Sequence, residues 1–164
     1  MDAVFAQIEK TWGKLDFIVH AIAYSDKDEL KGKYVDTSRT NFQRSLDISC
    51  FSFTDVCKRA SAIMPNGGSL LTLTYSGAER VMPHYNVMGV AKAALETSVQ
   101  YLANDLGPDN IRVNALCPVA GETGMLSLFM GEDTPEKRAQ FVASIPLGRL
   151  SQPREPKRAH AGST

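Results

Sequence analysis

Amphipathic stretches alternate with short apolar runs along this chain of 164 residues. In the amphipathic stretches the apolar positions recur at helical spacing, which predicts helices that each bury one face. These stretches are residues 3–11, a long one from 36–38 to about 64, residues 85–106 and residues 134–143. The apolar runs between them are too short for helices and predict buried strands over residues 15–20, 69–74 and 111–116.

The order of these elements predicts an α/β fold. Strands that alternate with long helices form βαβ units, so we expect three parallel strands in one sheet. A dinucleotide-binding sheet opens with a strand, a Gly-rich turn and a helix, and no such turn occurs in this sequence. The sequence therefore predicts an incomplete Rossmann-like, doubly wound parallel sheet.

Composition narrows the function. Eighteen basic residues balance 18 acidic ones, so no overall field attracts nucleic acid or an anionic membrane. No apolar run has the length of a membrane-spanning helix, and the amphipathic, acid-containing N-terminus is unlike a signal peptide. Cys50, Cys57 and Cys117 lack metal-ligand spacing, which favours reduced thiols, a cytoplasmic location and no metal site.

Candidate chemistry lies where the strands end. Ligands of open parallel sheets bind beyond the carboxyl ends of the strands, and the loop after the second strand leads to Tyr85. Lys92 follows Tyr85 by seven residues, a rotation within about 20° of two full helical turns. A phenol and an ammonium on one helix face can serve one ligand. The phenol can donate a proton, and the ammonium can hold ribose hydroxyls and lower the pKa of the phenol.

A family resemblance extends from Trp12 to Leu116. The segments that carry it are Leu15-Asp-Phe-Ile-Val-His-Ala-Ile22, Tyr34-Val-Asp-Thr-Ser38, Leu46-Asp-Ile-Ser-Cys-Phe-Ser-Phe53, Gly67-Gly-Ser-Leu-Leu-Thr-Leu-Thr-Tyr75 and Pro83-His-Tyr-Asn-Val-Met-Gly-Val-Ala-Lys-Ala-Ala94. They resemble the short-chain dehydrogenase/reductase superfamily, and within it the bacterial NADH-dependent enoyl-acyl-carrier-protein reductases. Most of the superfamily has Tyr-x-x-x-Lys, whereas Tyr85 and Lys92 have the wider spacing typical of the enoyl reductases.

The resemblance implies a role for each matched residue. Tyr85 would hydrogen-bond the enolate oxygen of a thioester, Lys92 would hold the nicotinamide ribose, and Tyr75 would line the acyl pocket and help complete the proton path. The other implied site residues are Ala21, Ile22 and Thr123 at the cofactor and Ser25 at the substrate. The implied reaction is the NADH-dependent reduction of trans-2-enoyl thioesters on acyl carrier protein, the last reduction in each cycle of bacterial fatty acid biosynthesis.

Departures from the family leave alternatives open. Residues 131–138 and 145–150 resemble the alcohol-oxidising branch of the superfamily, so a short-chain alcohol dehydrogenase or ketoreductase is one alternative. The Gly-rich half of the cofactor-binding fold is missing, so an inactive, truncated remnant is a further alternative. We expect a partial domain over residues 1–150 and a disordered polar tail over 151–164. Gly89 and Ala93 permit close helix packing and suit a homo-oligomer, which is a tetramer in the family.

Overall fold

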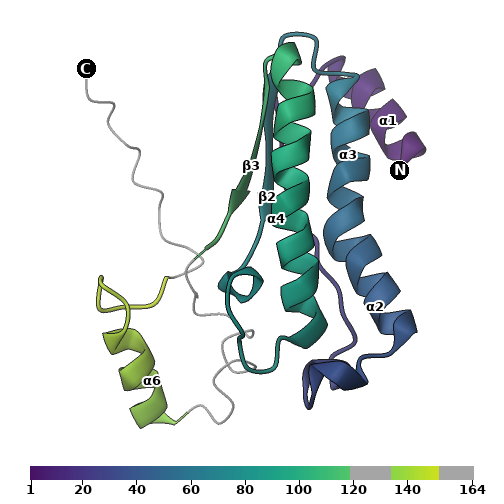
Figure 1. Ribbon diagram of the computed structural model, residues 1–164. Coiled ribbons are helices and arrows are strands. Elements are labelled where there is room, and N and C mark those ends of the chain that lie inside the picture. Colours follow the sequence, from purple (N-terminus) through teal and green to yellow (C-terminus); the bar gives the residue numbers. More distant parts are fainter. Residues whose placement is uncertain (119–133, 152–164) are drawn as a thin grey trace. The chain divides into compact units, whose positions relative to one another are not determined.

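The computed structural model describes residues 1–118 and 134–151 (Figure 1). The chain divides into two compact units, Met1–Pro118 and Val119–Thr164. In the second unit, α6 (Pro135–Ala143) begins after Thr134, whose hydroxyl accepts a hydrogen bond from the Lys137 backbone N–H at 3.3 Å. This confirms the helix predicted over residues 134–143. Thr123 and all of the predicted tail except Ser151 lie outside the described residues.

The first unit is built on a parallel sheet. Its three strands are β1 (Phe17–His20), β2 (Gly68–Leu73) and β3 (Ile111–Leu116), in the order β1-β2-β3. Ser69 is level with Phe17 on one side and with Arg112 on the other, and both strand pairs are parallel. The predicted strands and their parallel arrangement are therefore confirmed, and the carboxyl ends of all three lie at the same edge.

Four helices cover one side of this sheet (Figure 1). They are α1 (Asp2–Trp12), α2 (Arg39–Leu46), α3 (Ser52–Ser61) and α4 (Asn86–Leu106). The fully buried side chains between helices and sheet include Phe53, Leu70 and Leu95. Each such side chain contributes about 1.5–3 kcal/mol by leaving water, so this core fixes α4 over β2 and β3.

The long helix predicted up to residue 64 has an irregular centre. It begins after Ser38, whose hydroxyl caps it by accepting from the Asn41 N–H at 3.1 Å. Between α2 and α3, however, a π-helical segment spans Asp47–Phe51. Ser49 in this segment is fully buried and exchanges hydrogen bonds with both backbone groups of Tyr24. The π segment, a feature that often marks functional sites, thus anchors the loop after β1.

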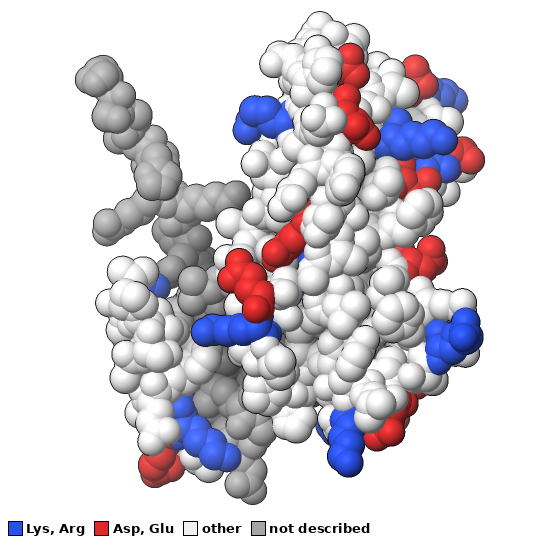
Figure 2. All heavy atoms as spheres, in the orientation of Figure 1, with Lys and Arg blue, Asp and Glu red and all other residues white. Residues whose placement is uncertain are grey.

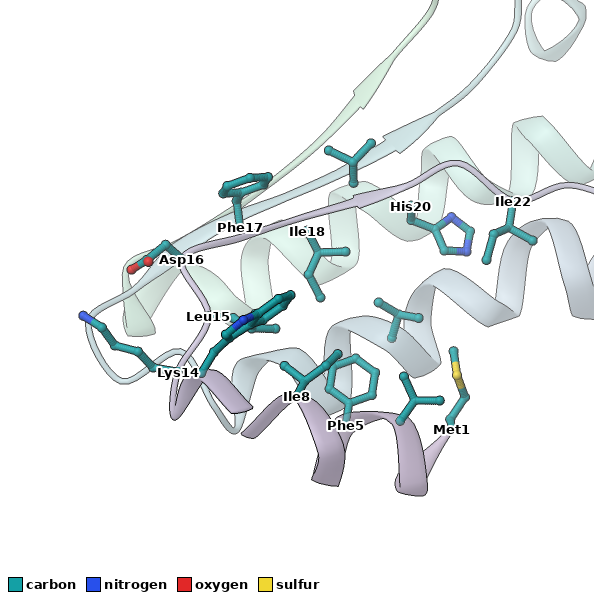
Figure 3. Close-up of a pocket in the computed structure, with 14 residues that line it drawn as sticks. Met1, Phe5, Ile8, Lys14, Leu15, Asp16, Phe17, Ile18, His20 and Ile22 are labelled. Atoms are coloured by element: carbon teal, nitrogen blue, oxygen red, sulfur yellow. The ribbon is translucent and has the colours of Figure 1, made fainter. Parts of the chain in front are cut away.

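β1 lies at the edge of the sheet in the described part of the chain. Phe17 and Val19 alternate with the inward residues of this strand and are 68% and 54% exposed. On the helix side, α1 and β1 border an apolar pocket of about 710 Å³, into which Phe5 and Ile8 project (Figure 3). Neither the two candidate tyrosines nor Lys92 lines this pocket. Of the residues predicted to bind the cofactor, Ile22 lines it.

The surface carries charges of both signs. Figure 2 shows acidic and basic side chains interspersed on the face in view, as the equal numbers of the two kinds lead one to expect. In residues 1–118 and 134–151, no helix is long and apolar enough to cross a membrane.

Candidate active site

Tyr75 and Tyr85, ten residues apart in the sequence, lie against each other. Tyr75 comes two residues after β2, and the 3₁₀ turn η4 (Ser76–Ala78) leads away from it. Tyr85 is the N-cap residue of α4. Their ring centroids are 4.9 Å apart with the ring planes inclined at 59°, a tilted arrangement that is favourable for aromatic pairs. The structure thus brings two of the predicted catalytic side chains together at the carboxyl edge of the sheet.

Two glycines make this arrangement possible. A Cβ added to Gly77 would lie 2.4 Å from Cδ1 of the Tyr85 ring, and one added to Gly89 would lie 2.7 Å from the Gly77 carbonyl oxygen. Real Cβ atoms do not approach other atoms so closely, so η4 rests directly on α4 and on the Tyr85 ring. Sequence reasoning assigned Gly89 to packing between chains. In the structure, the space above Gly89 is occupied by this chain's own Gly77.

Lys92 lies two turns beyond Tyr85 in α4 and is only 5% exposed. Its Nζ donates a hydrogen bond to the carbonyl oxygen of Leu73, the last residue of β2, at 2.7 Å. Burial lowers the pKa of Lys92 because the charged form loses contact with water. An ammonium carries three donors, so a ribose hydroxyl can be bound beside that carbonyl.

Burial controls the acidity of both phenols. It raises the pKa of Tyr85 well above its ordinary value, with smaller contributions from Tyr75 and Cys117, and it also raises the pKa of Tyr75. The sequence predicts the opposite, a lowered pKa for Tyr85, because it indicates the nearby ammonium of Lys92 but not the loss of water on burial. This prediction is wrong. A phenol with its ordinary pKa of 10 already keeps its proton at neutral pH, and burial shifts both pKa values further in that direction, so both hydroxyls are able to donate hydrogen bonds.

Three of the predicted cofactor and substrate residues, Ala21, Ile22 and Ser25, lie along the loop after β1. Ala21 and Ile22 are exposed directly after the strand. The Ser25 hydroxyl donates to Oδ1 of Asn41 at 3.3 Å and accepts from the Ser45 hydroxyl at 2.9 Å, which ties the loop to α2. Thr123 is outside the described residues, and the roles of all these side chains stay predictions. Within the described ranges, no three His, Cys, Asp or Glu residues are grouped to hold a metal ion.

His20, at the end of β1, is a packed residue, as its position in a parallel sheet predicts. It is 3% exposed. The Ser52 hydroxyl donates to the Ile48 carbonyl at 2.6 Å, so its oxygen accepts from Nε2–H of His20 at 2.9 Å. Nδ1 lies 3.1 Å from the Thr72 hydroxyl, whose proton is also within reach of the His20 carbonyl oxygen at 3.3 Å. The ring thus joins β1 to β2 and to Ser52 at the start of α3, and the imidazole is neutral when Thr72 donates to Nδ1.

We predict that His20 makes the stability depend on pH. Burial, assisted by the charge of Lys92, lowers its pKa from the ordinary 6.5. The unfolded chain consequently binds more protons just below pH 6.5, and stability falls as the pH drops through that window, by at most about 1.4 kcal/mol per pH unit. Urea unfolding at pH 7.5, 6.5 and 5.5 measures this loss. His20→Gln should show a shallower loss, and an equal loss in both proteins would contradict the prediction.

Fold and site together define the class: an α/β protein of the Rossmann-like, short-chain dehydrogenase/reductase type, with a tyrosine and a lysine two helical turns apart at the sheet edge. The sequence profile of the family described as enoyl-(acyl carrier protein) reductase matches residues 1–161. The chain belongs to this family.

Individual relatives agree with this assignment. The chain is 69% identical over 116 residues to enoyl-acyl-carrier-protein reductase (NADH) 1 of Rhizobium meliloti, a match that covers 71% of this chain and 43% of the relative. The solved reductase of Anaplasma phagocytophilum in complex with NAD is 62% identical, with a TM-score of 0.71 over 73% of this chain and 45% of that one. The Bacillus cereus reductase, solved with NADP+ and an indole naphthyridinone, is 47% identical with a TM-score of 0.80. This match covers 90% of this chain and 56% of that one. The chain spans about half the length of the relatives it matches.

Proposed function

We propose that this chain is an NADH-dependent enoyl-acyl-carrier-protein reductase that acts on trans-2-enoyl thioesters in bacterial fatty acid biosynthesis. One observation carries the proposal: a protonated, buried phenol at the start of α4 lies against Tyr75, with the Lys92 ammonium two turns further along the same helix. The names of the relatives, which specify NADH and the acyl-carrier-protein substrate, support it.

The side chains divide the chemistry between them. When bound, NADH supplies the hydride that adds to the β-carbon of the enoyl thioester. Negative charge then develops on the thioester oxygen, and the Tyr85 hydroxyl donates a hydrogen bond to that oxygen. The raised pKa of Tyr85 suits this role because the phenol keeps its proton until charge develops. Tyr75 lines the pocket for the acyl chain and helps complete the proton path.

The residues present fit the nicotinamide end of the cofactor. The Lys92 ammonium, held at the end of β2, would bind the ribose hydroxyls, and the exposed loop at Ala21 and Ile22 would contact the ring. Thr123 would bind the carboxamide, and Ser25 would lie near the substrate. The sequence given has no Gly-rich turn for the pyrophosphate, so the proposal assigns residues to the nicotinamide end of NADH only.

The proposal includes the setting of the reaction. Acyl carrier protein would present the enoyl thioester, and the protein would work in the cytoplasm as a homo-oligomer, a tetramer by analogy with the family. Sedimentation velocity of the purified chain tests the oligomeric state.

Two measurements together test the activity. The first follows NADH oxidation with crotonyl and longer enoyl thioesters, and turnover is expected. The second is a calorimetric scan with increasing NADH. A ligand that binds only the folded state raises the free energy of unfolding by mass action, by about 2.7 kcal/mol when its concentration is 100 times Kd. The unfolding midpoint must rise with it. Turnover of ketones without enoyl reduction would instead indicate the ketoreductase alternative, whose distinguishing segments, 131–138 and 145–150, lie within the described residues except for 131–133.

An inactive remnant is the second candidate. A chain that shows neither enoyl reduction nor a midpoint shift with NADH would support it.

A further inference from the structure

A second side chain of α4 holds the end of β2. Thr74, the residue after the strand, donates a hydrogen bond from its hydroxyl to Oε1 of Glu96 at 2.5 Å. Thr74 is only 7% exposed, and hydrogen bonds from a hydroxyl to a carboxylate are short and about twice as strong as neutral ones. The Thr74 backbone N–H also donates to the Leu116 carbonyl at 2.9 Å. Thr74 is thereby fixed both to the neighbouring strand and to the helix.

Glu96 and Lys92 act on consecutive residues of the strand end. They are four residues apart in α4 and thus lie on the same helix face. Lys92 binds the carbonyl of Leu73, and Glu96 binds the hydroxyl of Thr74. Tyr75 is the next residue. Lys92 and Glu96 of α4 therefore fix the position at which the chain leaves the sheet and enters Tyr75.

The segment is held again just beyond Tyr75. Gly77 lies against Gly89 and the Tyr85 ring with no room for a side chain. Only Tyr75 and Ser76 separate Thr74 from Gly77, so a short piece of chain is fixed to α4 at both ends. Without the Thr74 side-chain bond, the backbone bonds of Leu73 and Thr74 would still hold this end, but the Thr74 side chain would no longer be tied to α4.

We propose that Glu96 is a positioning residue: through Thr74 it holds Tyr75 against Tyr85 at the candidate active site. The positioning itself concerns only the geometry of this chain. Its effect on turnover rests on the proposed function, so the two are tested separately.

Nuclear Overhauser effects between the ring protons of Tyr75 and Tyr85 test the positioning without any ligand. Glu96→Ala and Thr74→Val each remove the bond, and both are expected to weaken or abolish these effects. Glu96→Gln retains an acceptor oxygen and Thr74→Ser retains the hydroxyl, so both should preserve them. Asp105→Ala, which removes an exposed acid from the same helix, is the matched control and should behave as the unaltered chain.

Retention of the effects in Glu96→Ala would overturn the proposal, as would equal losses in Glu96→Gln and Glu96→Ala. Should Glu96→Ala fail to fold, Thr74→Val decides, because valine has nearly the shape of threonine. In the enoyl-thioester assay, we expect kcat to fall about 10-fold in Thr74→Val with KM for NADH changed less than about 2-fold, since small misplacements of reacting groups cost up to about 100-fold. If the unaltered chain shows no turnover, the proposed function fails and the ring measurements still decide the positioning.

Discussion

Replacing Tyr85 by phenylalanine is expected to lower kcat for enoyl reduction by about 100-fold or more. Removal of one hydrogen-bond donor from a developing oxyanion typically costs about 10²–10³-fold in rate. The phenylalanine ring keeps the contacts with Tyr75 and with the backbone at Gly77. Loss of one buried hydroxyl should therefore change the free energy of unfolding by only about 1 kcal/mol.

Steady-state kinetics with saturating NADH and a crotonyl thioester measures this effect. Tyr101→Phe is the matched control, because Tyr101 lies in the same helix and is 70% exposed. It should leave kcat unchanged. The kcat of Tyr75→Phe should lie between those of Tyr85→Phe and Tyr101→Phe, since Tyr75 is assigned to the acyl pocket and the proton path. A Tyr85→Phe protein within about 2-fold of the unaltered rate would remove Tyr85 from the mechanism.

Local sequence signals were sufficient for most of the fold. The strands ending at His20, Leu73 and Leu116 are apolar runs bounded by turn residues, and their spacing by helices dictates a parallel sheet. The long helix was expected to begin at residues 36–38, and it begins after Ser38 because the hydroxyl of Ser38 accepts from the Asn41 N–H. The π segment at Asp47–Phe51 was not predicted from the sequence.

The candidate site was only partly predictable. The seven-residue spacing placed Tyr85 and Lys92 on one helix face, because this follows from the geometry of a single helix. The partners of that helix are non-local: Glu96 meets Thr74 22 positions away. No periodicity in a single segment predicts such a pairing, since it depends on how α4 crosses β2.

The direction of the pKa shift of Tyr85 could not be predicted from the sequence either. Sequence distance indicated a neighbouring ammonium, which lowers a phenol pKa, whereas the depth of burial that raises it depends on packing. Gly77 is the residue that brings the backbone onto the ring, and its position two residues after Tyr75 gave no sign of this contact. The tight fit at Gly77 is therefore the feature of the site that most needs an independent test.

Replacing Gly77 by alanine is expected to destabilise the protein by about 2–3 kcal/mol, near the upper end for overpacking of a buried site. The new Cβ would lie 2.4 Å from Cδ1 and 2.7 Å from Cε1 of Tyr85. That ring is only 7% exposed and is confined by Tyr75, so it cannot swing into solvent. Either the ring or the η4 backbone must move.

Urea unfolding of Gly77→Ala beside Gly107→Ala measures this cost. Gly107, at the end of α4, has open space around its Cα and no positive φ, so alanine there should change stability by less than about 0.5 kcal/mol. Repeating Gly77→Ala in a Tyr85→Ala background completes a double-mutant cycle. If the clash with the ring is the cause, most of the cost should disappear once the ring is gone. Equal unfolding midpoints for Gly77→Ala and Gly107→Ala would show that the Tyr85 ring is not confined by the turn above it.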